Sequence, residues 1–171
     1  MSNKPKIAKR KIPAKIQPPA TIEKLPRPIR IRMWHHIGDM AGCGTIRVMQ
    51  PAMILNNYFS RELDFESIYN NRFIPYPNAY KDCSFVTFQR SSTKQQHEML
   101  DHFRKCNPGK KVIYEIDDDL WNIPDWNFAS GFYNKNKKHI EAILRSVDGI
   151  VCSTQELKRL LTKYNNNIRV W

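Results

Sequence analysis

The sequence lacks the apolar runs and the cysteine pairs that define several large classes of protein. No stretch approaches the roughly 18 apolar residues of a membrane-spanning helix, and no apolar segment follows the basic N-terminus as in a secretory signal. The four cysteines include no C-x-x-C pair, which excludes zinc-ribbon and thioredoxin-like patterns. We therefore expect a cytoplasmic protein with reduced thiols.

Glycine is also scarce, with six glycines in 171 residues, and the common nucleotide-binding glycine motifs are missing. Gly38, Gly42 and Gly44 give the spacing G-x-x-x-G-x-G, which differs from the dinucleotide fingerprint G-x-G-x-x-G. No Gly-Lys-Ser/Thr of a Walker loop follows them. The sequence therefore does not predict NAD binding or a P-loop nucleotidase.

Acidic residues are few, because 16 Asp and Glu stand against 28 Lys and Arg, a formal net charge of +12. Such a charge favours anionic partners such as nucleic acid, phosphate-bearing metabolites or an anionic surface. Residues 1–28 hold eight of the basic residues against the single acid Glu23, together with six of the eleven prolines. This composition predicts a flexible basic tail, which acts either as a solubilising segment or as an arm that contacts phosphates.

From residue 29 to residue 171 the composition is that of a globular domain in which strands and helices alternate. The predicted strands are residues 30–34, 63–69, 84–89, 111–116, 149–152 and 168–171. The predicted helices are residues 45–58, 93–105 and 133–146, and a further helix capped by Ser153 or Thr154. This alternation predicts the α/β class, with a Rossmann-like, doubly wound parallel sheet.

Two segments with chemically useful residues follow predicted strands, at the edge where such sheets bind ligands. In the first, Gly42 and Gly44 open a helix and Arg47 follows one turn later, a pattern suited to an anion but also common in plain turns. His36, in the same segment, is a candidate base or metal ligand, or a structural histidine.

The second segment is the acidic triplet Asp117, Asp118 and Asp119, which ends the strand VIYEI. One carboxylate of such a triplet can coordinate Mg²⁺ or Mn²⁺, another can bind sugar hydroxyls, and a third can cap the following turn. Trp121 adds an aromatic face on which a sugar ring or a base can stack. A solvated turn with one capping aspartate is the alternative interpretation.

The order of these motifs resembles the N-terminal domain of GT-B-fold glycosyltransferases, especially those of tailed phages and of bacterial surface-polysaccharide clusters. The resemblance rests on GCGTIRVMQPAMIL, on YEIDDDLWNIP after FVTFQRSS, and on DGIVCSTQELKRLLTKYNNNIRVW. It covers residues 29–171, and it implies the single N-terminal half of a GT-B fold.

The resemblance also implies roles for individual residues. Gly42, Gly44 and Arg47 would face the donor phosphates, and the aspartate triplet would line the acceptor side of the cleft. The candidates for the base that deprotonates the acceptor are Asp117, Asp119 and His36. The candidates for binding the nucleotide-sugar donor or the acceptor are Gly42, Gly44, Arg47, Asp118, Trp121, Ser153 and Thr154. GT-B enzymes generally need no bound metal, so we expect no essential metal.

The expected function is transfer of a sugar from a nucleotide-sugar donor to an acceptor hydroxyl, on phage DNA in the host cytoplasm or on a surface glycan. In this family a second, C-terminal domain binds most of the donor, and the 171 residues contain no such domain. We therefore expect a partner domain or subunit after Trp171 and little activity from this chain alone. The alternative is a non-catalytic basic module that binds nucleic acid or a partner protein through residues 1–28.

Overall fold

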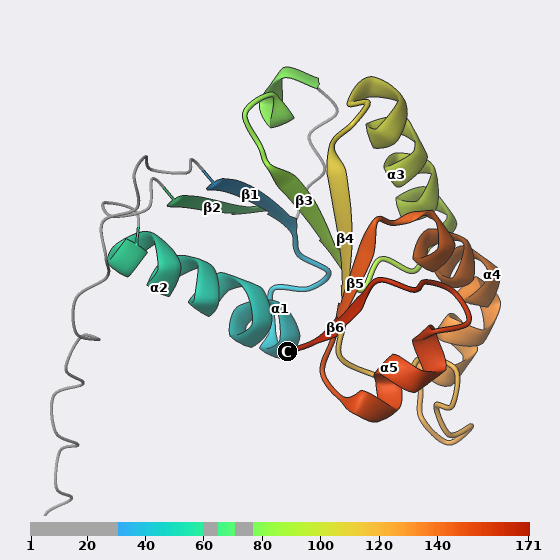
Figure 1. The fold of residues 1–171 in the computed structure, drawn as a ribbon. Helices are drawn as coiled ribbons and strands as arrows, with labels where there is room; N and C mark the ends of the chain where they lie inside the picture. The colour runs from blue at the N-terminus through green and yellow to red at the C-terminus, as the bar shows by residue number, and fades with distance from the viewer. Residues whose placement is uncertain (1–30, 60–64, 71–76) are drawn as a thin grey trace, which may run out of the picture.

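In the part of the chain that the structure describes, six parallel strands form a single sheet in the order β2-β1-β3-β4-β5-β6 (Figure 1). The structure is a computed structural model that describes residues 31–59, 65–70 and 77–171. The strands are β1 Ile31–His36, β2 Phe65–Asn70, β3 Phe85–Gln89, β4 Lys111–Ile116, β5 Gly149–Cys152 and β6 Ile168–Val170. The predicted α/β class and parallel sheet are confirmed, whereas the predicted tail, residues 1–28, lies outside the described residues.

Helices cover the sheet from two sides, as expected of a doubly wound, Rossmann-like fold. Figure 1 shows α2 on one side and α3, α4 and α5 on the other. The helical elements are α1 Gly42–Gly44, the π-helix η1 Thr45–Met49, α2 Gln50–Phe59, the 3₁₀ helix η2 Pro77–Tyr80, α3 Lys94–Cys106, α4 Ser130–Ser146 and α5 Gln155–Leu161. Of the predicted helices, the fourth begins after Thr154, whose side chain accepts a hydrogen bond from the Leu157 amide at 3.1 Å.

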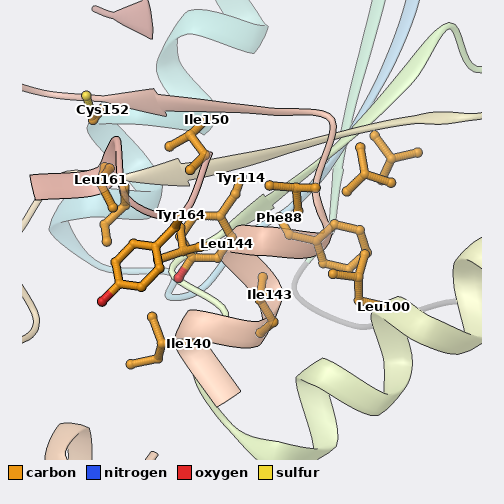
Figure 2. Packing of buried hydrophobic residues seen from close by; sticks show 14 of the residues in the cluster. Phe88, Leu100, Tyr114, Ile140, Ile143, Leu144, Ile150, Cys152, Leu161 and Tyr164 are labelled. Carbon is orange, nitrogen blue, oxygen red and sulfur yellow. The ribbon is translucent and has the colours of Figure 1, made fainter. Parts of the chain in front are cut away.

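The apolar core lies between the sheet and helices α3, α4 and α5 (Figure 2). Alternate side chains of the two central strands point into it, which is why Val112, Tyr114 and Ile116 of β4 are fully buried. Leu100 of α3 and Ile143 of α4 pack on them from the helical layer. This packing fixes β4, and with it the position of the aspartates that follow.

The helix after β1 begins three residues earlier than the sequence predicts and continues to Phe59 without a break. Pro51 has no backbone N–H, and in a regular α-helix its ring would clash with the carbonyl of the residue one turn back. The chain instead widens into the π-helical segment η1, in which the Gln50 amide donates to the Thr45 carbonyl. The early start brings the beginning of this helix to the carboxyl ends of β3 and β4.

Neighbouring strands β1 and β3 mark the place where the winding direction reverses. The chain leaves β1 for β2 on one side, and β3 then pairs with the other side of β1. The connections after β1 and β3 therefore run over opposite faces of the sheet. Their first residues lie beyond the carboxyl ends of the strands, at the switch point where α/β sheets usually bind ligands. Among the described residues, no helix is long and apolar enough to cross a membrane.

Candidate functional site

A buried ion pair joins the helix after β1 to the end of β4. Arg47, in η1, places its Nε against Oε1 of Glu115, which is 5% exposed. Burial raises the pKa of the Glu115 carboxyl, and the Arg47 guanidinium opposes that shift. The pair therefore brings together the two segments that the sequence analysis singled out.

Arg90, directly after β3, is the second cation of the site. Its Nη1 lies 3.1 Å from Oδ2 of Asp118 and 3.5 Å from Oδ1 of Asp117, and its Nη2 donates to the Tyr133 hydroxyl at 3.0 Å. Burial disfavours the charge, but the Tyr133 hydroxyl and the two carboxylates outweigh it and raise the pKa of Arg90. Its φ of 47° is left-handed, a conformation that non-glycine residues adopt rarely and that turns the chain sharply at this edge.

The loop after β1 is tied to β3 through the side chain of Gln89. Its Oε1 accepts from the Gly38 amide and its Nε2 donates to the Cys43 carbonyl, both at 3.2 Å. Arg90 Nη1 lies 3.2 Å from the Cys43 sulfur, and a hydrogen bond to Asp117 raises the pKa of that thiol. A Cβ on Gly38 would lie 2.6 Å from the Gln89 carbonyl oxygen, so this close approach requires glycine.

Three buried polar atoms of this cluster have no hydrogen-bond partner among the described residues. They are Nη2 of Arg47, Oε2 of Glu115 and Oδ1 of Asp117. Buried donors and acceptors are nearly always satisfied by protein, water or ligand. One free donor and two free acceptors therefore offer contacts that a hydroxyl group, which both donates and accepts, can complete.

The three aspartates of the triplet have three different environments. Asp117 is mostly buried, with 13% of its side chain exposed, and its carbonyl accepts a hydrogen bond from the Ser153 hydroxyl at 2.7 Å. Asp118 is 60% exposed and faces solvent beside Arg90. Asp119 accepts from the Trp121 amide at 3.0 Å and from the Asn122 side chain at 2.5 Å, so it caps the following turn.

Several predicted site residues are used in packing or helix capping and do not point into the cluster of Arg47, Glu115 and Asp117. Trp121 stacks on Tyr164 with ring centroids 5.6 Å apart, and Thr154 caps α5. Gly44 meets the Asp39 carbonyl so closely that a Cβ would lie 1.7 Å from its oxygen, whereas Gly42 faces open space. Of these residues only Gly42 presents an unobstructed surface.

His36 lies in the aromatic core, which does not support its predicted role as a base. Its ring stacks on Phe88 with centroids 4.7 Å apart, and its Nε2 lies 3.2 Å from the Tyr80 hydroxyl. Burial and the neighbouring His35 lower the pKa of His36 to about 4. The partly buried His35 contacts the hydroxyl groups of Thr87 and Ser67.

Sequence reasoning missed two residues of the site, Glu115 and Arg90. Glu115 is the only charged side chain within the strand VIYEI, and a charge in an otherwise apolar central strand was the available signal. Arg90 follows the strand FVTFQ directly and therefore lies at the same sheet edge as the aspartates. Its contact with Asp118 required the strand order, which the sequence does not state.

The formal charge of this site is negative, because the two guanidinium groups of Arg47 and Arg90 are outnumbered by three carboxylates. The carboxylates are those of Glu115, Asp117 and Asp118. The Nε of Arg47 is engaged by Glu115, whereas its Nη2 has no hydrogen-bond partner among the described residues. Within the described part of the chain, no three His, Cys, Asp or Glu side chains are grouped so that they could hold a metal ion.

Comparison with known proteins gives no further assignment. No protein-family model matches the chain, and no curated protein or solved structure matches it either. What can be inferred about function therefore depends on the residues at the carboxyl edge.

Proposed function

We propose that the chain is the acceptor-side domain of a GT-B-type glycosyltransferase, which moves a sugar from a nucleotide-diphosphate donor to an acceptor hydroxyl. The single observation that carries the proposal is the cluster of Arg47, Glu115 and Asp117, with its three buried polar atoms that lack partners. These atoms suit hydroxyl groups, and the excess of carboxylates in the cluster disfavours a free phosphate.

In this proposal Asp117 is the base that accepts the proton of the acceptor hydroxyl. Its Oδ1 accepts no hydrogen bond and lies 3.5 Å from Arg90 Nη1, and its backbone carbonyl is held by the Ser153 hydroxyl, so the carboxylate is positioned in advance. Asp118, which is largely exposed beside Arg90, would contact the sugar or the acceptor. Asp119 has no free role in the chemistry because both of its oxygens are used by the turn.

The donor diphosphate would be held mainly by a second domain, as the resemblance to GT-B enzymes implies. The contribution of this chain would be orientation of the acceptor hydroxyl and removal of its proton, with no essential metal. A cytoplasmic setting, in a bacterium or in a phage-infected host, is part of the same proposal.

Thermal unfolding in the presence of nucleotide-sugars and of oligosaccharide acceptors tests the proposal. We expect at least one acceptor glycan or nucleotide-sugar to raise the midpoint temperature of the wild type, and Asp117→Asn to reduce that increase. Asp101→Asn, which removes an exposed carboxylate on α3, is the matched control and should retain the full increase. No stabilisation by any glycan or nucleotide-sugar, or equal responses from the two variants, would contradict the proposal.

Catalysis is tested by adding a separate donor-binding domain of the GT-B type to the purified chain. Sugar transfer should require both components and should fall by at least a hundredfold in Asp117→Asn, the loss typical of a missing general base. Robust transfer by the chain alone would show that it is a complete enzyme of another kind.

The net charge of +12 favours a second candidate function, a non-catalytic module that binds nucleic acid. Fluorescence anisotropy with duplex DNA distinguishes it from the first. Binding that weakens steeply with added salt and disappears on removal of residues 1–28 would support this function. If DNA binding persists without these residues, the arm is not the binding element.

A further inference from the structure

An open hollow of about 440 Å³ lies where the chain passes from α5 to β6. Its lining consists of Arg145, at the end of α4, and residues 162–167. None of these residues belongs to the carboxyl-edge cluster. The hollow is large enough for a small ligand, so its chemistry can be considered independently of the proposed transferase site.

Two cations are gathered around one aromatic ring in this hollow. The Arg145 guanidinium carbon and the Lys163 Nζ each lie 4.9 Å from the centroid of the Tyr164 ring. The two charges can therefore be no further apart than twice that distance. Trp121 stacks on the same ring at an interplanar angle of 18°, which leaves less of the ring for the two cations. Like charges held this close repel each other, and a bound anion would relieve the repulsion.

Glu141, which pairs with Arg145, lies outside the lining and is already engaged. Glu141 accepts a hydrogen bond from the Tyr164 hydroxyl at 3.0 Å through Oε1. Its Oε2 lies 3.6 Å from Nη2 of the exposed Arg145, while the Glu141 side chain itself is only partly exposed. The lining itself contains no Asp or Glu and carries the positive charges of Arg145 and Lys163. Unlike the carboxyl-edge cluster, this surface therefore favours an anion.

Hydrogen bonds fix one wall of the hollow before any ligand arrives. The side-chain amide nitrogen of Asn165 donates to the backbone carbonyls of Leu144 and Val147 at 3.2 and 2.9 Å. The side-chain oxygen of Asn165 accepts from the backbone amide of Asn167 at 2.9 Å. Asn167 in turn donates to the Asp148 carbonyl at 2.8 Å. Asn166, between them, is exposed and carries a side-chain amide that can donate to an oxygen ligand.

We propose that this hollow binds a phosphate group, either as the free ion or as the ester of a small organic molecule. Arg145 and Lys163 supply the charge, the Asn166 amide supplies a hydrogen-bond donor, and the remaining volume accommodates the organic part of an ester. The site differs from the proposed transferase centre in ligand class, since the carboxylates of that centre disfavour phosphate.

Titration with inorganic phosphate, pyrophosphate and a nucleoside monophosphate, followed by nitrogen-correlated NMR spectra, tests this site. We expect saturable shifts of the side-chain amide signals of Asn165–Asn167 in the wild type. The double variant Arg145→Gln/Lys163→Gln should bind at least tenfold more weakly. Tighter binding of the monophosphate ester than of free phosphate would identify an ester as the ligand, and the reverse order would identify the ion.

The matched control removes the same charge from the exposed surface of α4. Lys137→Gln/Lys138→Gln should bind phosphate within twofold of the wild type, because neither lysine lines the hollow. Lys163→Glu alone provides a second variant, which should also lose binding while the far-ultraviolet spectrum stays that of the wild type.

Equal weakening in the two double variants would show that binding follows overall charge, and the site would be rejected. Absence of saturable shifts in the wild type would reject it as well. Asp117→Asn should leave phosphate binding unchanged, so loss of this site and loss of the transferase centre are separate results.

Discussion

At the scale of single residues, the two consecutive histidines of β1 show how burial determines the protonation state of a side chain. His35 and His36 point to opposite faces of the sheet, His36 into the buried aromatic cluster and His35 into a partly buried position. Burial lowers the pKa of each to about 4, so both rings are neutral at physiological pH. Protonation of either ring would destabilise the folded state, because a charged imidazole in either place would lose its hydration.

Acid should therefore weaken the fold in a defined pH window. Below about pH 6.5 the unfolded chain binds a proton at His36 that the folded chain refuses until about pH 4. Stability present above pH 6.5 is lost as the pH falls through that window, by about 3 kcal/mol for this residue. Urea unfolding between pH 7 and pH 4.5 measures the loss.

His36→Phe keeps an aromatic ring against Phe88 and should reduce the pH dependence, while the contribution of His35 remains. His102→Gln, on the exposed surface of α3, is the control and should retain the slope of the wild type. Identical slopes for His36→Phe and the wild type would refute the assignment.

Replacing one partner of the Arg47–Glu115 pair should lower the unfolding free energy more than replacing both. Glu115→Gln leaves a buried guanidinium without its counter-charge, and the expected loss is about 3 kcal/mol of unfolding free energy. The double variant Arg47→Met/Glu115→Leu replaces the pair with apolar groups and should recover most of that loss. Urea unfolding of the single and double variants makes the comparison. A single variant within 0.5 kcal/mol of the wild type would show that the pair is not buried as described.

At the scale of elements, the helix from Gly42 to Phe59 is shaped by two glycines with opposite surroundings. A Cβ on Gly44 would collide with the Asp39 carbonyl, while one on Gly42 would meet nothing within 4 Å. Gly44 therefore lets the loop after β1 fold tightly against the start of the helix, and so helps to place Arg47.

Gly44→Ala and Gly42→Ala form a matched pair that tests this placement. The first should cost about 2–3 kcal/mol, because the loop must move to make room for the methyl group. The second should raise stability by about 0.5 kcal/mol through better helix propensity. Thermal and urea unfolding measure both. Equal changes in unfolding free energy from the two substitutions would mean that the loop after β1 moves to accommodate the methyl group without loss of stability.

The regular elements were predictable from the sequence to the extent that local patterns determine them. The predicted bounds of residues 111–116 and 149–152 agree with β4 and β5, because short runs such as VIYEI and GIVC have no helical periodicity. The predicted start of the first helix was wrong by three residues, since G-C-G indicates a loop from its composition, whereas in the structure the Ala41 and Gly44 amides donate to Asp39 Oδ1 where this helix begins. The 3₁₀ helix η2 was not predicted, because four residues around a proline give no periodic signal.

The site was predictable only in part. The sequence indicated that Asp117 and Arg47 lie at one sheet edge, and they do share one cluster, because both follow parallel strands. It did not reveal Glu115 or Arg90, whose roles depend on which strands are neighbours. The capping role of Asp119 was one of the alternatives that the triplet left open, and the structure gives it that role.

At the scale of the whole molecule, the strand order divides the sheet into a protected centre and two edges. β3 and β4 have paired strands on both sides, whereas β2 and the three-residue β6 lie at the edges. Apolar burial is also greatest at the centre, where Val86, Val112, Tyr114 and Ile116 are fully covered. Opening of the edges should therefore require less free energy than opening of the centre.

Hydrogen exchange should reveal this gradient. Amides of β3 and β4 are expected to exchange only through global unfolding, so their protection should equal the unfolding free energy measured with urea. Amides of β6 should exchange at least tenfold faster through local opening. Exchange of all six strands at one rate would show that the sheet opens only as a unit.

The consecutive order of β3, β4, β5 and β6 within the sheet has a consequence for synthesis of the protein. The strands β4, β5 and β6 each pair with the strand made just before them, so each finds its partner already present when it leaves the ribosome. The sheet can thus grow outward during translation, one strand at a time, and no earlier strand needs to be displaced. β3 is the exception, because the strand made just before it is β2, whereas its earlier partner in the sheet is β1.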